Sequence, residues 1–426
     1  MAGDWVSRTF GECAELVYDT VLPGSVAGAP YIGLEHIGEG TLSLVGCGQS
    51  EDVSSVKLRF RRGDILFGKL RPYFRKVIRA PFDGVCSTDI WVVRPKESVD
   101  AGYLHYLMAS PEFIEAATRG SEGTKMPRAK WDFVTRIAFP VPSLPEQRAI
   151  AHILGTLDAK IELNRRMNET LEAMARALFK SWFVDYEPVR AKMEGRWRRG
   201  ECLVGLPSDL YDLFPDRLVE SELGEIPEGW EVKSLNEVAD FLNGLALQKY
   251  PPGNGPTLPI IKIAQLRKGD TEGADRCNTE VPVDYVVTDG DVLFSWSGSL
   301  ECVLWAGGTG ALNQHLFKVT SRNYPKWFYY FWIHEHLLGF RSIAADKATT
   351  MGHIQRHHLT DAKVVVPGAP ALTAADCLIS PLVKQLLALR TESRTLAASR
   401  DTLLPKLVSG ETRVKDAEKF LEERGL

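Results

Sequence analysis

Positive charge is concentrated in one short stretch in the first part of the chain. A single acid, Asp64, stands there among nine lysines and arginines, with Tyr73 and Phe74 between them. Lysine and arginine at this density neutralise DNA phosphates, and arginine can also read the edge of guanine. For one such run alone, a solvated basic surface is an equally good explanation. The nine basic residues are Lys57, Arg59, Arg61, Arg62, Lys69, Arg71, Arg75, Lys76 and Arg79.

A second basic loop, RGSEGTKMPRAK over residues 119–130, lies further along the same block. It carries Arg119, Lys125, Arg128 and Lys130 among glycines, which let a backbone approach a ligand closely. Two basic runs in one block, each followed by a predicted strand, favour nucleic-acid binding over a solvated face.

The patterns that would indicate a nucleotide, a metal or catalysis are incomplete. Gly63–Lys69 matches GxxxxGK, but a phosphate loop needs Ser or Thr where Leu70 stands. No cysteine or carboxylate completes a compact zinc set with His353, His357 and His358. The sequence also lacks a Ser–His–Asp arrangement, a glycine-rich cofactor motif and an adenine-methylation motif. We therefore expect no catalytic residue, no metal and no cofactor in this chain.

Short strands and helices alternate around the basic runs, which predicts an α+β block. An amphipathic helix is expected near Thr9–Val17 and another helix near Tyr103–Thr118, and a last strand ends at Pro140. The aromatic-rich segment 327–340 replaces the second of these helices later in the chain, and its rings are expected in the core. The other expected strands are Tyr31–Ile37, Asp64–Phe67 and Ile90–Val93.

Residues 145–182 have the apolar spacing of a coiled coil, with steps that alternate between four and three residues. At about 1.5 Å per residue they predict a rod of roughly 55 Å. Two asparagines lie in the middle of the seam, where a polar residue costs stability but fixes register. The seam residues are Ile150, Leu154, Leu157, Ile161, Asn164, Asn168, Leu171, Ala175, Leu178 and Trp182.

The seam has a second copy 225 residues later, and so does most of the chain. Trp5 and Trp230 are also 225 residues apart, and RGDILFGK (62–69) resembles DGDVLFSW (289–296). The sequence is therefore predicted to be a tandem duplication of a globular block followed by a long helix. The second seam consists of Ala375, Ile379, Leu382, Leu386, Leu389, Ser393, Leu396, Arg400, Leu403 and Leu407.

The composition is that of a globular chain of 426 residues, with 44 % hydrophobic residues and a net charge of −4. Its seven cysteines form no CxxC pair, which is typical of reduced thiols in a cytoplasmic protein. MAGDWVSRTF has no basic start followed by an apolar run, so we expect no secretory signal. We expect no membrane span, because no stretch reaches about 18 uncharged apolar residues.

With these motifs placed, nearly the whole chain resembles the specificity subunit of a Type I restriction–modification system. PSLPEQRAIAHILGTLDAKIELNRRMNETLEAMARALFKSWFVDYEPV is similar to the central conserved region of that family. ELGEIPEGWEVKSLNEVADF (222–241) resembles the start of the second target-recognition domain, and SRDTLLPKLVSGE (399–411) resembles the C-terminal conserved region.

The resemblance implies a non-catalytic DNA reader with two α+β target-recognition domains in tandem, separated and followed by long helices that pack as an antiparallel coiled coil. Each domain would read one half of a split, asymmetric DNA site. The helices would set the spacing and dock two modification subunits, which bind S-adenosylmethionine and methylate adenine. Motor–nuclease restriction subunits would complete this cytoplasmic, prokaryotic complex.

The expected segments follow from the repeat and the resemblance. They are recognition domain 1 (1–144), the central helix (145–184), a linker (185–225), recognition domain 2 (226–370), the C-terminal helix (371–410) and a tail (411–426). The second conserved region lacks the PEQR opening of the first and has Pro381 in its early turns. Docking of the two modification subunits is therefore expected to be unequal.

The DNA-contacting loops of the family carry over only to matching positions. In the first domain these are Lys69, Arg71, Arg75, Thr124, Lys125 and Arg128. In the second they are Trp296, Ser297, Thr349, Thr350 and His353. The second set is less basic and better suited to reading base edges than to gripping phosphates. Which residues contact bases and which contact phosphates stays open.

Two other functions also stay open. An enzyme acting alone would need a methylation or nuclease motif, and a methylation assay on the isolated chain tests for it. A coiled-coil interaction protein that never touches DNA predicts no retention on mixed-sequence duplex at low salt.

Overall fold

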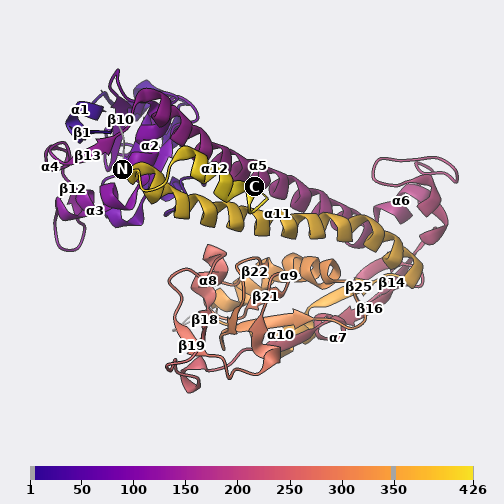
Figure 1. Cartoon of the computed structure of the whole chain (residues 1–426). Coiled ribbons are helices and arrows are strands. Elements are labelled where there is room, and N and C mark those ends of the chain that lie inside the picture. Colours follow the sequence, from indigo (N-terminus) through magenta and orange to yellow (C-terminus); the bar gives the residue numbers. More distant parts are fainter. Residues whose placement is uncertain (1–4, 347–351, 426) are drawn as a thin grey trace. The chain divides into compact units, whose positions relative to one another are not determined.

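The computed structural model describes residues 5–346 and 352–425 (Figure 1). The chain forms two compact units, one from residues 1–163 and 393–426 and the other from residues 164–392. Each unit contains one globular block together with part of α5 (Leu144–Phe183) and part of α11 (Ala369–Ser409). These units cut across the predicted segment boundaries, because each block packs on portions of both long helices.

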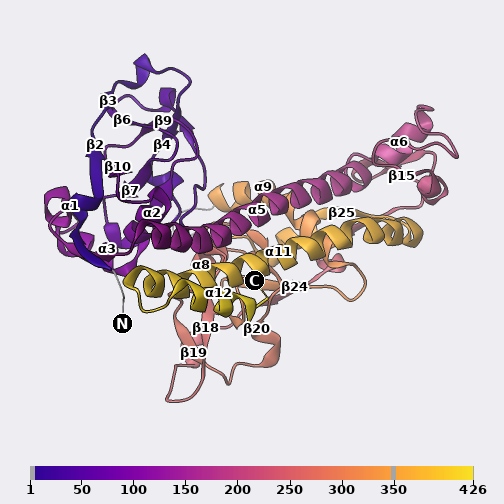
Figure 2. The same cartoon turned by 45° about the horizontal axis from the view of Figure 1, so that its top comes forward.

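The first block is built on a four-stranded antiparallel sheet (Figure 2). Its strand order is β2 (Ala14–Val17), β10 (Ile90–Pro95), β7 (Ile65–Gly68) and β8 (Val77–Arg79). The order in the second sheet is β3 (Thr20–Val21), β6 (Lys57–Phe60), β9 (Gly84–Cys86), β4 (Pro30–Ile32) and β5 (Gly48–Gln49). The short strand β1 (Val6–Thr9) pairs with β13 (Ala138–Val141).

Alternation along β7 explains how this block is layered, because successive side chains of a strand point to opposite faces. Ile65 and Phe67 pack in the core that contains α2 (Ala101–Ala109) and α3 (Pro111–Arg119). Leu66, between them, packs in the core of the second sheet. The central sheet is therefore covered by helices on one face and by a sheet on the other.

The second block repeats this topology, which confirms the duplication. Its central sheet has the order β17 (Asp240–Asn243), β24 (Leu316–Thr320), β21 (Val292–Ser295) and β22 (Cys302–Leu304). Its other sheet has the order β19 (Arg276–Asn278), β18 (Thr257–Ile261), β23 (Gly310–Leu312) and β20 (Val286–Val287). β18 runs parallel to β23, as β4 does to β9, and β16 (Glu231–Ser234) pairs with β25 (Lys363–Val366) as β1 does with β13.

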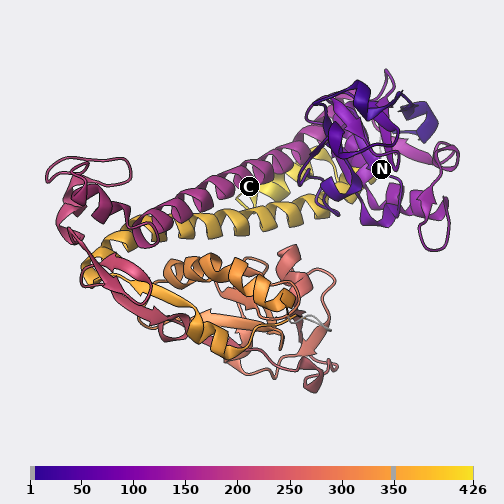
Figure 3. The ribbon, with the colours of Figure 1, turned by 180° about the vertical axis from the view of Figure 1, so that it is seen from behind.

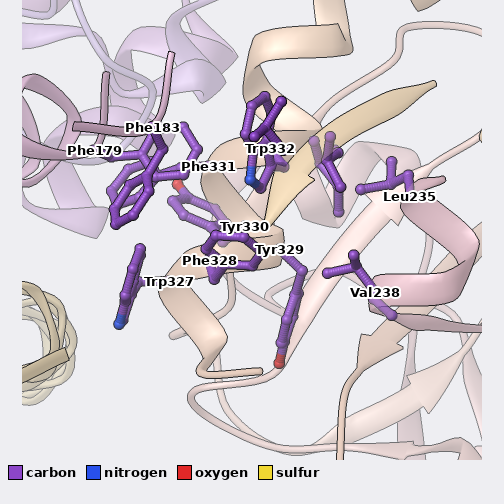
Figure 4. Close-up of a cluster of buried hydrophobic side chains, with 14 of the residues drawn as sticks. Phe179, Phe183, Leu235, Val238, Trp327, Phe328, Tyr329, Tyr330, Phe331 and Trp332 are labelled. Atoms are coloured by element: carbon purple, nitrogen blue, oxygen red, sulfur yellow. The ribbon is translucent and has the colours of Figure 1, made fainter. Parts of the chain in front are cut away.

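The aromatic segment forms α9 (Lys326–Asp346), which lies along the central sheet of the second block (Figure 3). Phe328 and Phe331 are buried there, and the ring centroid of Phe179 on α5 lies 5.4 Å from that of Phe331, with the two rings tilted (Figure 4). These rings are core residues, as predicted. Each large aromatic side chain buries a large apolar area, so this cluster of rings stabilises the packing of α9 and α5 in the second unit.

In both units α5 and α11 pack side by side and run antiparallel. In the first unit the core includes Leu154 of α5 and Leu403 of α11, and in the second it includes Ala175 and Ile379. Asn164 is fully buried in the seam and donates to Glu392 at 2.7 Å. All other predicted seam residues are buried or half-buried.

The helix α11 runs unbroken past Pro381, although a proline was expected to interrupt its early turns. Among the residues that the structure describes, α11 is also long and apolar enough to cross a membrane by length and composition alone. Core helices meet the same criterion, and the buried face of α11 packs against α5.

Several predicted elements differ from the structure. Thr9–Val17 is not one helix but α1 (Phe10–Cys13) followed by β2, because Leu16 and Val17 pair with β10. The helix expected over Tyr103–Thr118 is broken at Ser110, whose extended backbone precedes the proline that opens α3. The strand expected over Tyr31–Ile37 ends at Ile32 and continues as a 3-10 turn.

The segment predicted as a linker is folded, and the tail forms a short helix. Trp197 and Phe214, within the predicted linker, are buried in the core of the second unit, and the ring of Phe214 lies 5.2 Å from that of Trp182. This segment contains α6 (Glu187–Met193) and the hairpin of β14 (Leu218–Ser221) and β15 (Gly224–Pro227). In the tail, α12 (Val414–Glu422) buries Ala417.

The remaining short elements are β11 (Ser121–Glu122), β12 (Arg128–Ala129), α4 (Trp131–Val134), α7 (Leu235–Val238), α8 (Ile263–Lys268) and α10 (Arg356–Asp361).

Candidate nucleic-acid interface

The two predicted basic loops of the first block lie side by side at the end of β7. The backbone N–H of Lys69 donates to the carbonyl of Asp89 at 2.9 Å, and the N–H of Ala129 donates to the carbonyl of Lys69 at 2.9 Å. The N–H of Arg71 donates to the carbonyl of Pro127 at 2.7 Å. These bonds join residues 69–71 to the segment before β10 on one side and to residues 127–129 on the other.

The second block makes the same three backbone bonds at the end of β21. The N–H of Trp296 donates to the carbonyl of His315, and the N–H of Ile354 donates to the carbonyl of Trp296. The third bond joins Gly298 and Gly352 at 2.8 Å. Lys69 and Trp296 therefore occupy equivalent positions. The predicted contacts Thr349 and Thr350 lie outside the described residues.

In the first block the chain forms an arch over residues 71–75. Arg71 and Arg75 both have left-handed backbone angles, with φ of 52° and 50°, and flank a 3-10 turn at Pro72–Phe74. A non-glycine residue in this region costs about 1–2 kcal/mol, so surrounding contacts must hold the arch in place. One such contact is the guanidinium of Arg71, which donates to the carbonyl of Lys125 at 3.2 Å.

The predicted cations differ in how far their charge is already neutralised. Arg128 makes a two-point ion pair with Asp89, at 2.9 and 3.3 Å, and Arg75 pairs with Asp401 at 2.8 Å. No acid among the described residues lies within ion-pair distance of Lys69, Arg71 or Lys125. Lys69, Arg71 and Lys125 are therefore the predicted cations best placed to bind a phosphate.

Other members of the basic run have structural roles. Lys57 is buried and donates to the carbonyl of Ser55 at 2.9 Å, and Lys76 donates to the carbonyl of Leu34 at 2.7 Å. Exposed apolar side chains accompany the free cations instead. Tyr73 on the arch is 50 % exposed, and Met126, next to Lys125, is 48 % exposed. Met126 is absent from the predicted set because sequence alone does not show which apolar residues stay on the surface.

The second block presents neutral polar and aromatic groups at the equivalent place. The indole N–H of Trp296 lies 3.0 Å from Oδ1 of Asn243 and 3.1 Å from the carbonyl of Gln314. The hydroxyl of Ser297 and Nδ1 of His315 are 3.0 Å apart, and His353 meets the Trp296 ring edge-on. Ser297 is only 3 % exposed, and the partner of its hydroxyl is the imidazole of His315.

Asn243, Gln314 and His315 belong to this cluster. The sequence already offers Gln314 and His315 as polar side chains suited to reading base edges, whereas Asn243 was not predicted. A signal for His315 was present in the repeat, since it stands just before β24 as Asp89 stands just before β10. Asn243 carries no such signal, because β17 reaches the cluster only through its pairing with β24.

The described residues bring no group of three or more His, Cys, Asp or Glu side chains together. The histidines of α9 are used within the fold. The ring of His334 lies 3.2 Å from the guanidinium of Arg176, and that of His336 lies 2.8 Å from the carbonyl of Lys363.

Comparisons with known proteins agree with this architecture. The family model described as Type I restriction modification DNA specificity domain matches twice, over residues 28–173 and 227–373. The Type I restriction enzyme MjaIX specificity subunit of Methanocaldococcus jannaschii is 28 % identical over 338 residues, which cover 76 % of this chain and 71 % of that protein. The HindI specificity subunit of Haemophilus influenzae is 24 % identical over 404 residues, covering 83 % and 88 % of the two chains.

A solved structure shares the fold. The crystal structure of a Type I restriction-modification system S subunit from M. genitalium has a TM-score of 0.55 and 14 % identity, and the match covers 95 % of this chain and 96 % of that one. The two family matches coincide with the two repeated blocks and include the strands that carry the candidate loops. The chain therefore belongs to the family of Type I restriction–modification DNA specificity subunits.

Proposed function

We propose that each recognition domain reads one half of a split, asymmetric DNA sequence through the loops at the ends of β7 and β21. The observation that carries this proposal is the repeated backbone frame, which presents different side chains in the two domains. A shared frame docks on DNA in one way, while different side chains select different bases. Two related domains with different readouts therefore suit two unequal half-sites.

In the first domain, Lys69, Arg71 and Lys125 contact phosphates, and Thr124 lies close enough in sequence to reach a base edge beside them. Lysine and arginine contacts to phosphate supply affinity and make it depend on salt. Arg75 and Arg128 hold the loops through their carboxylate partners. In the second domain, Trp296, His315 and His353 contact bases, together with the predicted Thr349 and Thr350.

The chain is not itself the enzyme, because specificity subunits are the non-catalytic, DNA-recognising components of Type I restriction–modification systems. In our proposal α5 and α11 set the gap between the half-sites and dock two modification subunits. The outward side of α5 supports docking, since Leu163, Met167 and Met174 are 51 %, 39 % and 49 % exposed. S-adenosylmethionine binds to the modification subunits, and motor–nuclease restriction subunits complete the assembly in the prokaryotic cytoplasm.

Genome-wide mapping of adenine methylation in the native host, with and without this gene, tests the proposal. Deletion is expected to remove one methylated motif made of two short half-sites separated by a fixed gap. A methylation map that does not change on deletion, although the modification subunit is expressed, would contradict the proposal. Replacing the second domain by that of another specificity subunit is expected to change only one half of the motif.

A further inference from the structure

We infer that Arg75 and Asp401 are positioning residues, which fasten the DNA-facing arch 71–75 to the helix pair α5–α11 and do not themselves contact DNA. The inference rests on the proposed function, because it assigns a role within the same DNA-reading loop. It replaces the direct DNA contact that the family resemblance predicted for Arg75.

A series of ion pairs and hydrogen bonds links the arch to the helices, and it starts at the end of the arch. Nη2 of Arg75 donates to Oδ1 of Asp401 at 2.8 Å and to the carbonyl of Gly40 at 3.1 Å. The same carboxylate oxygen of Asp401 accepts from Arg400, at 3.1 Å from Nη2 and 3.2 Å from Nε. Arg75 therefore reaches α11 through a carboxylate that is shared with a second arginine.

The path continues into the seam between the helices. Arg400 is 2 % exposed and occupies a seam position where the heptad pattern favours an apolar residue. Its Nη1 donates to Oδ1 of Asp158 on α5 at 2.7 Å and to the carbonyl of Thr41 at 3.0 Å. The other oxygen of Asp158 accepts from the hydroxyl of Tyr106 on α2 at 2.7 Å. The cluster thus joins α5, α11, α2 and the arch.

The charges of this cluster are balanced, because two guanidinium groups face two carboxylates. The charge of Arg75 is therefore already neutralised, unlike that of Lys69 or Lys125. The side chain of Arg75 is 22 % exposed, and it turns toward α11. The left-handed backbone of Arg75 also needs outside contacts to persist, and the bonds to Asp401 and Gly40 provide them.

A positioning role and a phosphate contact predict different binding behaviour. Loss of a phosphate contact lowers the slope of log affinity against log salt by about one. Loss of a positioning residue weakens binding but leaves the slope unchanged. Asp401 makes the sharper test, because removal of a negative charge near DNA strengthens binding if electrostatics alone is at work.

The experiment uses the full-length chain and a duplex that carries the mapped site, with fluorescence anisotropy at four salt concentrations. Arg75→Ala and Asp401→Ala are each expected to weaken binding by roughly three- to tenfold at an unchanged slope, as loss of an ion pair would. The double variant is expected to bind DNA no more weakly than the weaker-binding single variant, because both substitutions break the same set of contacts. Asp401→Glu is expected to restore much of the affinity.

A readout at the half-sites separates positioning from general damage. The affinity loss is expected to disappear on duplexes in which the half-site of the first domain is scrambled, and to persist when the other is scrambled. Glu411→Ala, which removes an exposed acid just beyond α11, serves as the control and is expected to leave affinity unchanged or slightly higher. Far-UV circular dichroism confirms that the variants are folded.

Two outcomes overturn the inference. Stronger or unchanged binding by Asp401→Ala would show that the ion pair does not position the arch, and a lower salt slope for Arg75→Ala would show a phosphate contact. Lys69→Ala and Lys125→Ala identify failure of the proposed function itself. If neither changes affinity or slope, the loops are not at the DNA and both proposals fall.

Discussion

The two recognition domains share a backbone frame at the candidate interface but differ in the charge that the frame presents. In the first domain Lys69 and Asp89 meet through the same backbone bond that joins Trp296 and His315 in the second. Cations and an ion pair in one domain are thus replaced by an indole and an imidazole in the other. The fold of the loop is therefore set by strands and backbone hydrogen bonds, which leaves the side chains free to differ.

The domains also differ in how they are fastened to the helices. In the first, Asp158 of α5 pairs with Arg400 of α11, and their side chains are 24 % and 3 % exposed. In the second, Glu172 of α5 pairs with Arg390 of α11, at 28 % and 30 % exposure. Each acid also accepts a hydrogen bond from a tyrosine hydroxyl of its domain. The donor to Asp158 is Tyr106, at 2.7 Å, and the donor to Glu172 is Tyr330 on α9, at 3.4 Å. The two acids are about equally exposed, but the arginine is buried in the first domain and partly exposed in the second.

The largest effect is expected from removing the arginine of each pair. Arg400→Ala leaves Asp158 without its buried partner and is expected to destabilise the chain by about 3 kcal/mol, whereas Arg390→Ala is expected to cost about 1 kcal/mol because water reaches that pair. Urea unfolding followed by tryptophan fluorescence measures both. Equal losses would show that burial does not separate the two pairs.

A matched control is available for the first pair. Replacing both partners, as Asp158→Asn with Arg400→Met, removes the stranded charge and is expected to recover part of the stability lost in Arg400→Ala. A double variant less stable than Arg400→Ala would mean that the cost comes from packing and not from the unpaired carboxylate.

The next effect concerns pH. Burial lowers the pKa of His105 in the first domain to about 4, and burial together with the charge of Arg176 lowers the pKa of His334 in the second to about 4. An unfolded histidine titrates near 6.5, so between pH 6.5 and 4 the unfolded chain binds more protons than the folded chain. Stability is therefore expected to fall on acidification, by up to about 1.4 kcal/mol per pH unit for each histidine.

Unfolding midpoints measured from pH 7 to 4.5 test this expectation and compare the domains. His105→Leu is expected to flatten the pH dependence, because it removes the imidazole whose pKa burial lowers. Nδ1 of His105 is buried and makes no hydrogen bond among the described residues, so leucine breaks no hydrogen bond of that atom. His152→Leu, at an exposed position on α5, is the control and should leave the dependence unchanged. An unaltered profile for His105→Leu would show that this imidazole binds its proton at the same pH in the folded and the unfolded chain.

The smallest effect is expected from single contacts at the interface. Lys125→Ala in the first domain should weaken binding and lower the salt slope by about one, whereas His315→Ala in the second should leave the slope unchanged and relax base preference by about 1 kcal/mol. Binding to duplexes with single substitutions in each half-site, over a range of salt, measures both. A change of slope for His315→Ala would remove the contrast between the domains. Lys415→Ala, an exposed lysine on α12, is the control.

The sequence by itself determined the duplication, the helix seam and the aromatic core of the second block. These features are periodic or repeated, so hydrophobic spacing and a constant offset reveal them without knowledge of the fold. Local periodicity failed at Thr9–Val17, where pairing with β10 overrides a helical pattern. It also missed the break at Ser110, although the following proline was a visible signal.

Only the tertiary structure decided which predicted cations already have a carboxylate partner. Asp89 neutralises Arg128 from 39 residues away, and Asp401 neutralises Arg75 from 326 residues away. The sequence does not distinguish these arginines from Lys69 and Lys125, because no local pattern shows which acid will lie beside each cation. Charge pairing acts over a few ångströms in space, and strand order and helix packing set those distances.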